Sequence, residues 1–413
     1  MKAKEYIFIL GRYPELSKLE IFALLRKLEI KSEIIFESDT VLVLKTQIEI
    51  NVSELNKVLG GTVKIGELVR SFPQSVHEDE LEEYFTSASI FEEIFINPPT
   101  KLVFGISLYP YARQHDKTNN LARFQRKLIH LLKDHLDQQG FKTRYPHLDG
   151  TFLSSASVDK NKILTSGAEI LLIETPTQLY IGKTLTVQEF ESFSKRDYGR
   201  PKRDMESGIM PPKIARMMIN IAEIEKEETL LDPFCGSGTL IQEALLLGYK
   251  KVIGTDLSQK AIHDTKENII WLRKNSDVTT TPQILQHDVT KLAEKLQPRS
   301  VDAIVTEPYM GPNLKNKPHL KDVQKTKAEL EDLYLNAFKS FAQVLKPGGS
   351  IVMIFPVFHV HHHYLMIDLL DKIARLGFSQ VVLSHEKRNS LLLGNSQDYV
   401  LREIIKWKRE DYE

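Results

Sequence analysis

The chain has 413 residues, of which 42% are hydrophobic and 27% are charged, and its 55 Lys and Arg balance its 55 Asp and Glu. This length can form two or three domains with sizeable cores, and the single cysteine, Cys235, excludes an internal disulfide and argues against a thiolate metal site. The sequence shows neither an apolar run of membrane-spanning length nor a secretory signal, so we expect a cytoplasmic protein without a membrane segment.

The first 185 residues alternate short β-like runs with helical patterns. The β-like runs are YIFIL, VLVLK, TVKIGELV, KLVFGISLY, TFLSSASV, EILLIET and QLYIGKTL, and the helical patterns include PELSKLEIFALLRKLE and NVSELNKVLG. This alternation predicts small α+β domains with mixed sheets.

A basic helix is predicted within residues 113–133, where leucines and a phenylalanine recur at helical spacing. Residues 101–146 contain 9 Lys and Arg against 3 Asp and Glu. Arg113, Lys117 and Arg123 are therefore candidate contacts to RNA phosphates. A solvated helix face without a partner has the same pattern.

Residues 186–210 are polar, basic and interrupted by proline, which predicts a linker. Arg200 and Arg203 in this stretch are further candidate phosphate contacts, although linkers are often basic for solubility alone. We therefore expect an N-terminal α+β domain at 1–75, a second domain at 76–185, this linker, and a C-terminal domain at 211–413.

From residue 211 the pattern changes to strand, glycine turn and helix, repeated. It runs through ETLLDPFCGSGTLIQEALLLG, KKVIGTDLSQKAIHDTKENIIWL, TPQILQHDVTKLAEKL, SVDAIVTEPY and LKPGGSIVMIF. Near-continuous apolar strands that alternate with helices predict a parallel, doubly wound α/β sheet. Such a sheet binds its ligand outside the carboxyl ends of the strands, so the residues that follow each strand are the candidate site.

A glycine turn follows the first of these strands. Asp232 leaves the strand, Gly236 and Gly238 allow the backbone to turn tightly, and a helix begins near Thr239. The turn has neither the lysine of a phosphate loop nor the full dinucleotide fingerprint.

Two further strands also end in an acidic residue. Asp256 lies one βα unit downstream, where a carboxylate can accept hydrogen bonds from both hydroxyls of a ribose. Asp288, after the next strand, could accept from an exocyclic amine, although either aspartate could instead cap a helix. Together with the glycine turn, these residues predict a pocket for an adenosine-type cofactor.

Motifs across the chain resemble one family. DPFCGSGTLIQEA is similar to the first motif of class I S-adenosylmethionine-dependent methyltransferases. The preceding RDYGRPKRDMESGIMPPKIARMMINIA resembles the linker and cofactor-flanking helix of the tRNA guanine-N2 methyltransferases that act on position ten of tRNA. VLGGTVKIGELV, VFGISLY and LSSASVDKNKIL resemble that family's N-terminal and THUMP domains, which hold tRNA.

The resemblance implies a Rossmann-like methyltransferase domain at 211–413, a THUMP-like domain at 76–185, S-adenosylmethionine as cofactor and tRNA as partner. It assigns the turn from Asp232 to Thr239 to the methionine moiety of the cofactor, Asp256 to the ribose and Asp288 to the adenine. It also implies that the stretch MPPK at 210–213 closes over the cofactor. The cofactor-binding residues expected in this way are Asp232, Cys235, Gly236, Gly238, Thr239, Asp256, Leu257, Asp288 and Pro211.

A fourth strand ends in the loop Thr306-Glu307-Pro308-Tyr309, which the resemblance aligns with an Asp/Asn-Pro-Pro-Tyr motif. A side-chain oxygen and a backbone carbonyl in such a loop can accept the two N–H bonds of an exocyclic amine and orient its nitrogen toward the methyl group. We favour Glu307 as the acceptor, with Thr306 as the alternative. Pro308 would fix the turn, and Tyr309 would stack on the base.

The sequence thus predicts a monomeric tRNA guanine-N2 methyltransferase, and the resemblance leaves open a small activator protein. Alternatives are an rRNA guanine-N2 or DNA adenine-N6 methyltransferase, and a catalytically inactive tRNA-binding protein. The histidine-rich stretch HVHHHY at 359–364 is interpreted as the start of a helix rather than as a metal site.

Overall fold

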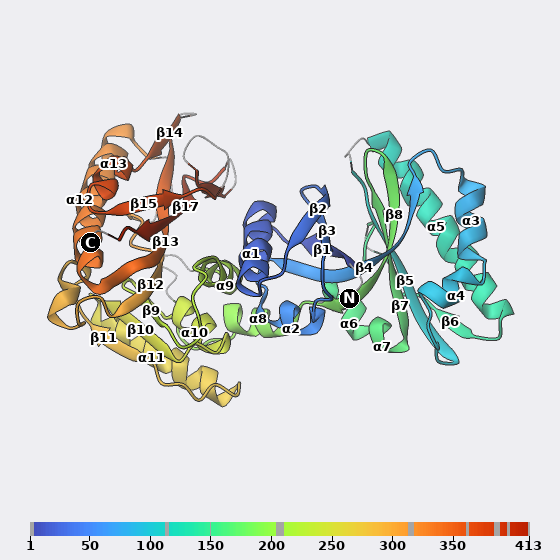
Figure 1. The fold of residues 1–413 in the computed structure, drawn as a ribbon, viewed down its shortest axis with the longest axis horizontal. Helices are drawn as coiled ribbons and strands as arrows, with labels where there is room; N and C mark the ends of the chain where they lie inside the picture. Colours follow the sequence, from blue (N-terminus) through green and yellow to red (C-terminus); the bar gives the residue numbers. More distant parts are fainter. Residues whose placement is uncertain are drawn as a thin grey trace. The chain divides into compact units, whose positions relative to one another are not determined.

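The computed structural model describes residues 4–111, 115–148, 150–203, 210–312, 318–360, 363–383, 389–394 and 397–411, with only the backbone described for 115–121. The chain divides into two compact units, one made of Met1–Lys18 and Leu25–Glu191 and the other of Leu19–Leu24 and Ser192–Glu413 (Figure 1). Within the described residues, no helix combines the length and the apolar character needed to cross a bilayer.

The first unit contains one mixed sheet. Its strands in the described residues, in the order in which they lie side by side, are β2 (Ser32–Glu37), β3 (Val41–Thr46), β1 (Lys4–Leu10), β4 (Thr62–Pro73), β8 (Gln178–Val187), β7 (Gly167–Glu174), β5 (Lys101–Tyr109) and β6 (Lys142–Arg144). β5 runs parallel to β6 and β7, and β4 pairs antiparallel with both β1 and β8. The sheet is therefore continuous across residue 75, and the division into two N-terminal domains stays a prediction.

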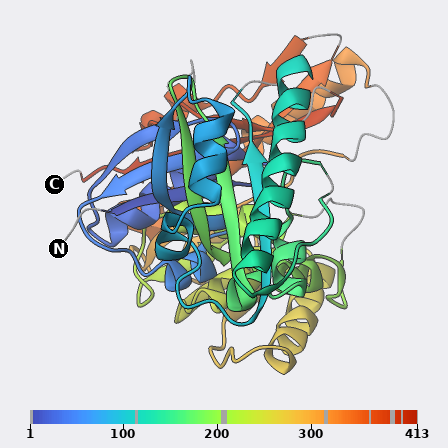
Figure 2. The ribbon, with the colours of Figure 1, turned by 90° about the vertical axis from the view of Figure 1, so that its right-hand side faces the viewer.

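Seven helices accompany this sheet in the described residues. They are α1 (Pro14–Lys27), whose residues 19–24 belong to the second unit, α2 (Val52–Val58), α3 (Glu78–Phe85), α4 (Ser89–Glu93), α5 (His115–Gln138), α6 (Ser155–Lys160) and α7 (Ile163–Ser166). Figure 2 shows the long helix α5 running along the strands of the sheet. Its Leu128, Leu132 and Leu136 are fully buried in one cluster with residues of α3, β5 and β7, so the predicted basic helix exists and has an apolar face that packs on the sheet.

The predicted strand TFLSSASV is wrong, because Ser155–Lys160 within and after it form helix α6. The Ser154 hydroxyl accepts a hydrogen bond from the Ser157 N–H at 3.1 Å, which is the usual arrangement of a serine N-cap. The local capping signal outweighs the short alternation of polar and apolar residues.

The second unit contains the predicted parallel α/β sheet. Its main strands in the described residues, in spatial order, are β11 (Gln283–Gln286), β10 (Lys251–Asp256), β9 (Thr229–Asp232), β12 (Val301–Thr306), β13 (Leu345–Val360), β17 (Val400–Arg409) and β15 (Phe378–Val381). The first five are parallel to one another, whereas β17 is antiparallel to both β13 and β15. The short strands β14 (His363–Met366) and β16 (Leu391–Leu393) pair with β13 and β17. The predicted doubly wound sheet is confirmed.

Two described helices of this unit precede its first strand, and the others lie between its strands in the chain (Figure 1). The first two are α8 (Phe190–Tyr198), whose first two residues belong to the first unit, and α9 (Pro212–Ile221), and the others are α10 (Thr239–Leu246), α11 (Gln259–Lys274), the 3₁₀ helix η1 (Val289–Glu294), α12 (Leu320–Val344) and α13 (Leu370–Ala374). α12 buries Tyr334, Phe338 and Phe341, and Phe338 packs edge-on against Trp407 of β17 with ring centroids 5.0 Å apart. This aromatic core holds the C-terminal strands against α12.

One prediction for this part of the chain needs correction. The stretch 359–364 does not start a helix, because His359 lies in β13 and pairs with Tyr364 of β14 in an antiparallel hairpin. The stretch 186–210 contains α8, whose Arg196 is buried within the second unit, and its assignment as a linker stays a prediction.

Candidate active site

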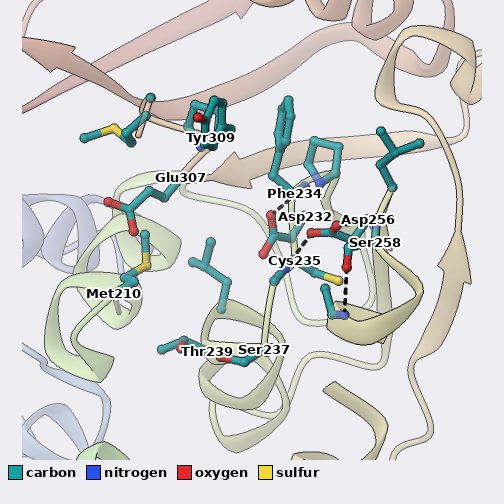
Figure 3. Close-up of a pocket in the computed structure, with 18 of the residues that line it drawn as sticks. Met210, Asp232, Phe234, Cys235, Ser237, Thr239, Asp256, Ser258, Glu307 and Tyr309 are labelled. Atoms are coloured by element: carbon teal, nitrogen blue, oxygen red, sulfur yellow. Dashed lines mark hydrogen bonds between the residues drawn. The ribbon is translucent and has the colours of Figure 1, made fainter. Parts of the chain in front are cut away.

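The carboxyl ends of β9, β10 and β12 surround a cavity of about 800 Å³ (Figure 3). The residues that line it include Met210, Asp232, Phe234, Cys235, Gly236, Ser237, Thr239, Asp256, Leu257, Ser258, Lys260, Ala261, Asp288, Val289, Glu307, Pro308, Tyr309, Asp398, Val400 and Arg402. The structure therefore brings residues after four different strands together, as expected for an open parallel sheet. A volume of this size is within the range of pockets that hold small molecules and cofactors.

The glycine turn after β9 forms one wall of the cavity. Gly236 has φ +51° and Gly238 has φ +82°, both in the left-handed region that favours glycine. A Cβ on Gly238 would lie 2.9 Å from a methyl carbon of Thr265, whereas a Cβ on Gly236 would meet nothing within 4 Å. Gly238 thus allows close packing against α11, and Gly236 leaves open space beside the backbone.

Asp256 is the last residue of β10, and the backbone around it fixes its carboxylate. Its Oδ2 accepts a hydrogen bond from the Gly236 N–H at 2.9 Å, and its Oδ1 accepts from the Ser258 N–H at 2.9 Å (Figure 3). The capping residue of α11 is Ser258, so Asp256 does not have the alternative role of a helix cap. Each oxygen keeps acceptor capacity for a ligand, because a carboxylate offers about four lone-pair sites.

Asp288 lines the cavity, but it also caps a helix. Its Oδ1 accepts from both the backbone N–H and the hydroxyl of Thr290, at 2.9 and 2.8 Å, at the start of η1. The backbone hydrogen bond from Thr290 is the main cause that lowers the pKa of Asp288. Both roles weighed for this residue from the sequence are therefore compatible with its position.

Asp232 is buried at the floor of the cavity. Its Oδ1 accepts hydrogen bonds from the Thr306 hydroxyl at 2.7 Å and from the Phe234 N–H at 3.3 Å. Burial raises the pKa of Asp232 to about 7, against an ordinary value of 3.8, in spite of the opposing effect of these hydrogen bonds. Thr306 is fully buried, donates its hydroxyl to Asp232 and is absent from the cavity lining, so the structure does not place it where an amine could reach it.

Glu307 extends into the cavity from the loop after β12 (Figure 3). Its Oε1 accepts a hydrogen bond from Nε of Arg402, on β17, at 2.6 Å. Tyr309 is 52% exposed, and its carbonyl accepts a hydrogen bond from the buried Tyr334 hydroxyl at 2.6 Å. An acidic side chain and an exposed aromatic ring thus stand on a loop that is anchored from two sides.

The stretch at 210–213 contributes Met210 to the cavity wall (Figure 3). Pro211 is the N-cap residue of α9 and is absent from the cavity lining, so Met210 rather than Pro211 is the residue of this stretch that lines the cavity. Pro212 starts the helix, where the missing N–H of proline would have no intrahelical partner in any case.

Arg200 does not form the predicted surface for RNA phosphates, because its side chain is buried. Its Nη1 donates to the hydroxyl of Thr239, which lines the cavity, while its Nε and Nη2 have no hydrogen-bond partner among the described residues. Arg203 is only partly buried, with its guanidinium 5.2 Å from the centroid of the Tyr198 ring. Its predicted contact to RNA stays a prediction.

The basic helix α5 carries fewer uncompensated charges than its sequence suggests. Arg113 and the side chain of Lys117 lie outside the described residues, and Arg123 is exposed. Lys127 forms an ion pair with Glu82, and Lys133 with Asp137 of the same helix. Arg123 is therefore the candidate phosphate contact that the structure places on the surface.

Sequence reasoning missed Arg402. Met210 belongs to the stretch 210–213 that was expected to close over the cofactor, although Pro211 was singled out as the contact within it. Arg402 lies 95 positions after Glu307 in a strand with no motif of its own, and only the antiparallel insertion of β17 next to β13 brings it to the cavity. No pattern in the sequence could have identified that pairing.

Comparisons with known proteins agree with this architecture. Residues 200–363 match the family of RMKL-like methyltransferase domains, and residues 109–267 match a DNA methylase family. A tRNA (guanine(10)-N2)-dimethyltransferase of Methanocaldococcus jannaschii is 29% identical over 179 residues, which are 43% of this chain and 46% of that protein. The chain therefore aligns with about half the length of this curated relative.

Two solved structures share the fold over almost the whole chain. TrmN from Thermus thermophilus has a TM-score of 0.57 at 14% identity and covers 98% of this chain and 99% of its own. SMU.472 complexed with SAH has a TM-score of 0.52 at 13% identity and covers 100% of both chains. These comparisons agree with the resemblance inferred from the sequence motifs: residues 200–363 match the RMKL-like methyltransferase domain family, and 43% of the chain is similar to a tRNA guanine-N2 methyltransferase.

Proposed function

We propose that this protein transfers a methyl group from S-adenosylmethionine to N2 of a guanosine in tRNA, with position ten as the expected site. The observation that carries the proposal is the placement of Glu307, Pro308 and Tyr309 in the same cavity as the glycine turn and Asp256. An acceptor for an exocyclic amine and a ring that can stack on a base thus face residues suited to an adenosine-type cofactor.

The residues present fit S-adenosylmethionine. The open space beside Gly236 gives room for the methionine part of the cofactor against the backbone. Asp256 is held by two backbone N–H groups with its carboxylate in the cavity, which suits it to the ribose hydroxyls. Asp288 and the apolar Val289, which follow β11, also line the cavity. Their carboxylate and apolar side chain suit an adenine ring.

Arg200 provides a second test of this fit. A buried guanidinium with two nitrogens that lack a partner is unfavourable unless an acceptor is supplied from elsewhere. Arg200 is bonded to the side chain of Thr239, the first residue of α10 and part of the cavity wall, but is itself absent from the cavity lining. The carboxylate of the methionine moiety would satisfy these two nitrogens, and the helix N-terminus favours the same negative charge.

The chemistry needs little more than correct placement of the amine. When bound, S-adenosylmethionine supplies a methyl carbon to which the N2 lone pair forms a bond while the carbon–sulfur bond breaks and leaves its electrons on sulfur. Glu307 accepts an N2–H bond, which directs the nitrogen lone pair and stabilises the positive charge that develops there. The proton that N2 then loses passes to Glu307 or to water.

Tyr309 would hold the base. Its side chain is half exposed and lines the cavity, and the neighbouring Pro308 is buried and fixes the backbone. A guanosine must leave its helix to reach this position, and stacking on an aromatic ring compensates for the stacking that is lost. The first unit would bind the rest of the tRNA, and the exposed Arg123 on α5 is a candidate contact.

Nucleoside mass spectrometry of unmodified tRNA incubated with the protein and S-adenosylmethionine tests this function. We expect N2-methylguanosine, mapped to one nucleotide, and loss of about 100-fold or more in rate for Glu307→Gln, because a well-placed charged acceptor supplies an effect of that size. SAH binding by the variant, measured by calorimetry, shows whether the cavity is intact.

The same assay separates the alternatives. Methylguanosine in rRNA but not in tRNA would identify a different RNA substrate, and N6-methyladenine in DNA would identify a DNA enzyme. The DNA methylase match ends at residue 267, before the loop at 306–309, and so carries no information about the acceptor loop. Cofactor and tRNA binding without any methyl transfer would leave a binding protein and would contradict the proposal.

A further inference from the structure

We propose that Arg402 is a positioning residue that holds the carboxylate of Glu307 in the orientation required to accept the target amine. This inference rests on the function proposed above. It is based on the ion pair between Arg402 of β17 and Glu307 of the loop after β12. These two segments lie far apart in the sequence, and no single motif contains both residues.

The pair joins two side chains of the cavity wall. Arg402 Nε donates to Glu307 Oε1 at 2.6 Å, and the two side chains are 31% and 16% exposed. Partial burial makes such a charge-assisted hydrogen bond stronger and more directional than the same pair would be on the surface. In the part of the chain that the structure describes, Oε2 of Glu307 accepts no hydrogen bond, so one oxygen is held and the other remains for a ligand.

A glutamate at this position requires such an anchor. Its side chain has one more methylene than aspartate, which moves the carboxylate by about 1.5 Å and adds a rotatable bond. The loop also contains one proline, Pro308, where the motif that it resembles has two. A bond from a rigid strand to Oε1 removes the extra freedom of the side chain.

The strand that supplies Arg402 is well suited to this task. β17 pairs with β13 over nine residues and packs its Trp407 in the aromatic core, so the backbone at Arg402 is fixed. On the other side of the loop, the Tyr334 hydroxyl holds the Tyr309 carbonyl at 2.6 Å. The acceptor oxygen and the stacking ring are therefore positioned by two different elements.

Arg402 could alternatively contact the RNA directly, and a double-mutant cycle distinguishes the two roles. The variants are Arg402→Met, Arg402→Lys, Glu307→Gln and the double variant that combines R402M with E307Q. Lys408→Met is the matched control, because it removes a positive charge from the same strand at a position whose side chain donates to the Gly348 carbonyl, away from the cavity lining. Single-turnover methyl transfer, the KM for tRNA and SAH binding are measured for each.

If Arg402 acts through Glu307, R402M lowers the methyl-transfer rate by about 100-fold, since small misplacements of an aligned group have effects of that size. KM for tRNA and affinity for SAH stay at the wild-type values, R402K restores part of the rate, and the double variant is no slower than E307Q alone. Lys408→Met transfers methyl at the wild-type rate.

Other outcomes overturn the inference. A rise in KM for tRNA with an unchanged rate would assign Arg402 to RNA binding. Independent losses that multiply in the double variant would mean that the two residues act separately. An unchanged rate in R402M would reject the role of Arg402 alone, whereas a wild-type protein that methylates no tRNA would reject the proposed function as well.

Discussion

At the scale of single residues, Asp232 is distinguished by a pKa of about 7, which burial raises from 3.8. Between these two pH values the unfolded chain ionises this carboxyl while the folded protein keeps it protonated. Folding therefore loses stability as the pH rises through this window, and the loss is complete above pH 7. The Thr306 hydroxyl bonded to Asp232 would be equally able to donate to an asparagine.

The variant Asp232→Asn should remove this pH dependence. Relative to the wild type, its free energy of unfolding should rise by up to about 4 kcal/mol as the pH increases from 4 to 7, because each pKa unit corresponds to about 1.4 kcal/mol. Urea unfolding at a series of pH values measures the difference. Asp288→Asn is the matched contrast: the pKa of Asp288 is lowered, so its stabilising effect is present at neutral pH and is lost as the pH falls. Parallel pH profiles for wild type and D232N would contradict the expectation.

Arg200 provides a prediction about ligand binding. Replacement by methionine should weaken binding of SAH by about 10- to 100-fold, the range expected for hydrogen bonds to a charged group. Binding of 5′-methylthioadenosine, which has no carboxylate, should be unchanged in the same variant. Calorimetry with both ligands makes the comparison, and Arg203→Met, in the same segment, is the control. Equal losses for both ligands would mean that the substitution distorts the cavity.

The sequence predicted much of this site at the residue scale because its chemistry depends on local patterns. The glycine turn, Asp256 and Glu307 could be located from the order of strand ends alone. The environment of Arg200 could not be, because a basic residue in a polar, proline-containing stretch has the composition of an exposed linker. Its burial depends on the contact with Thr239, which lies 39 positions further along the chain.

At the scale of secondary-structure elements, α8, α9 and α10 meet at one buried carboxylate. Glu243 of α10 accepts from Arg196 of α8 at 2.5 Å and from Arg216 of α9 at 2.7 Å, and its side chain is 1% exposed. The ring of Phe193 lies against both guanidinium groups, with distances of 4.4 and 4.9 Å to its centroid. This cluster fixes the predicted linker onto the helix that follows the glycine turn.

Removal of the carboxylate by Glu243→Ala should destabilise the protein by about 3–5 kcal/mol, because two buried positive charges lose the carboxylate that compensates them. The free energy of urea unfolding measures the effect. Replacement of all three residues by apolar ones, R196M, R216M and E243L together, should recover much of the loss, since no unpaired charge then remains. A change below about 1 kcal/mol for Glu243→Ala would show that water or other groups compensate the arginines.

Element types followed from the sequence where the periodic pattern was long, as in α5 and the strands of the parallel sheet. Shorter segments were less predictable. Residues 151–158 were expected as a strand, yet the Ser154 cap makes Ser155–Lys160 a helix. The histidine-rich stretch was expected as the start of a helix, yet its end joins a hairpin on β13. In both cases one capping bond or one strand pairing outside the segment decides its conformation.

At the scale of the whole molecule, a net formal charge of zero requires that any attraction to tRNA comes from local clusters. On α5, Lys127 and Lys133 are already paired with carboxylates, whereas Arg123 is exposed. Arg123→Gln should therefore weaken tRNA binding and reduce the slope of log affinity against log salt by about one, as for the loss of one phosphate contact. Filter binding over a salt series measures the slope, with Lys133→Gln as the control.

The position of Arg402 in β17 also has a consequence for the order in which the protein is made. Tyr309 and every earlier residue of the cavity are synthesised before Arg402, which follows Tyr309 by 93 positions (402 less 309). At ordinary rates of translation this delay is about 5 to 20 s. During that time the nascent chain can fold the glycine turn and the parallel strands, but the acceptor Glu307 has no anchor. The site therefore becomes complete only when β17 has left the ribosome and inserted between β13 and β15.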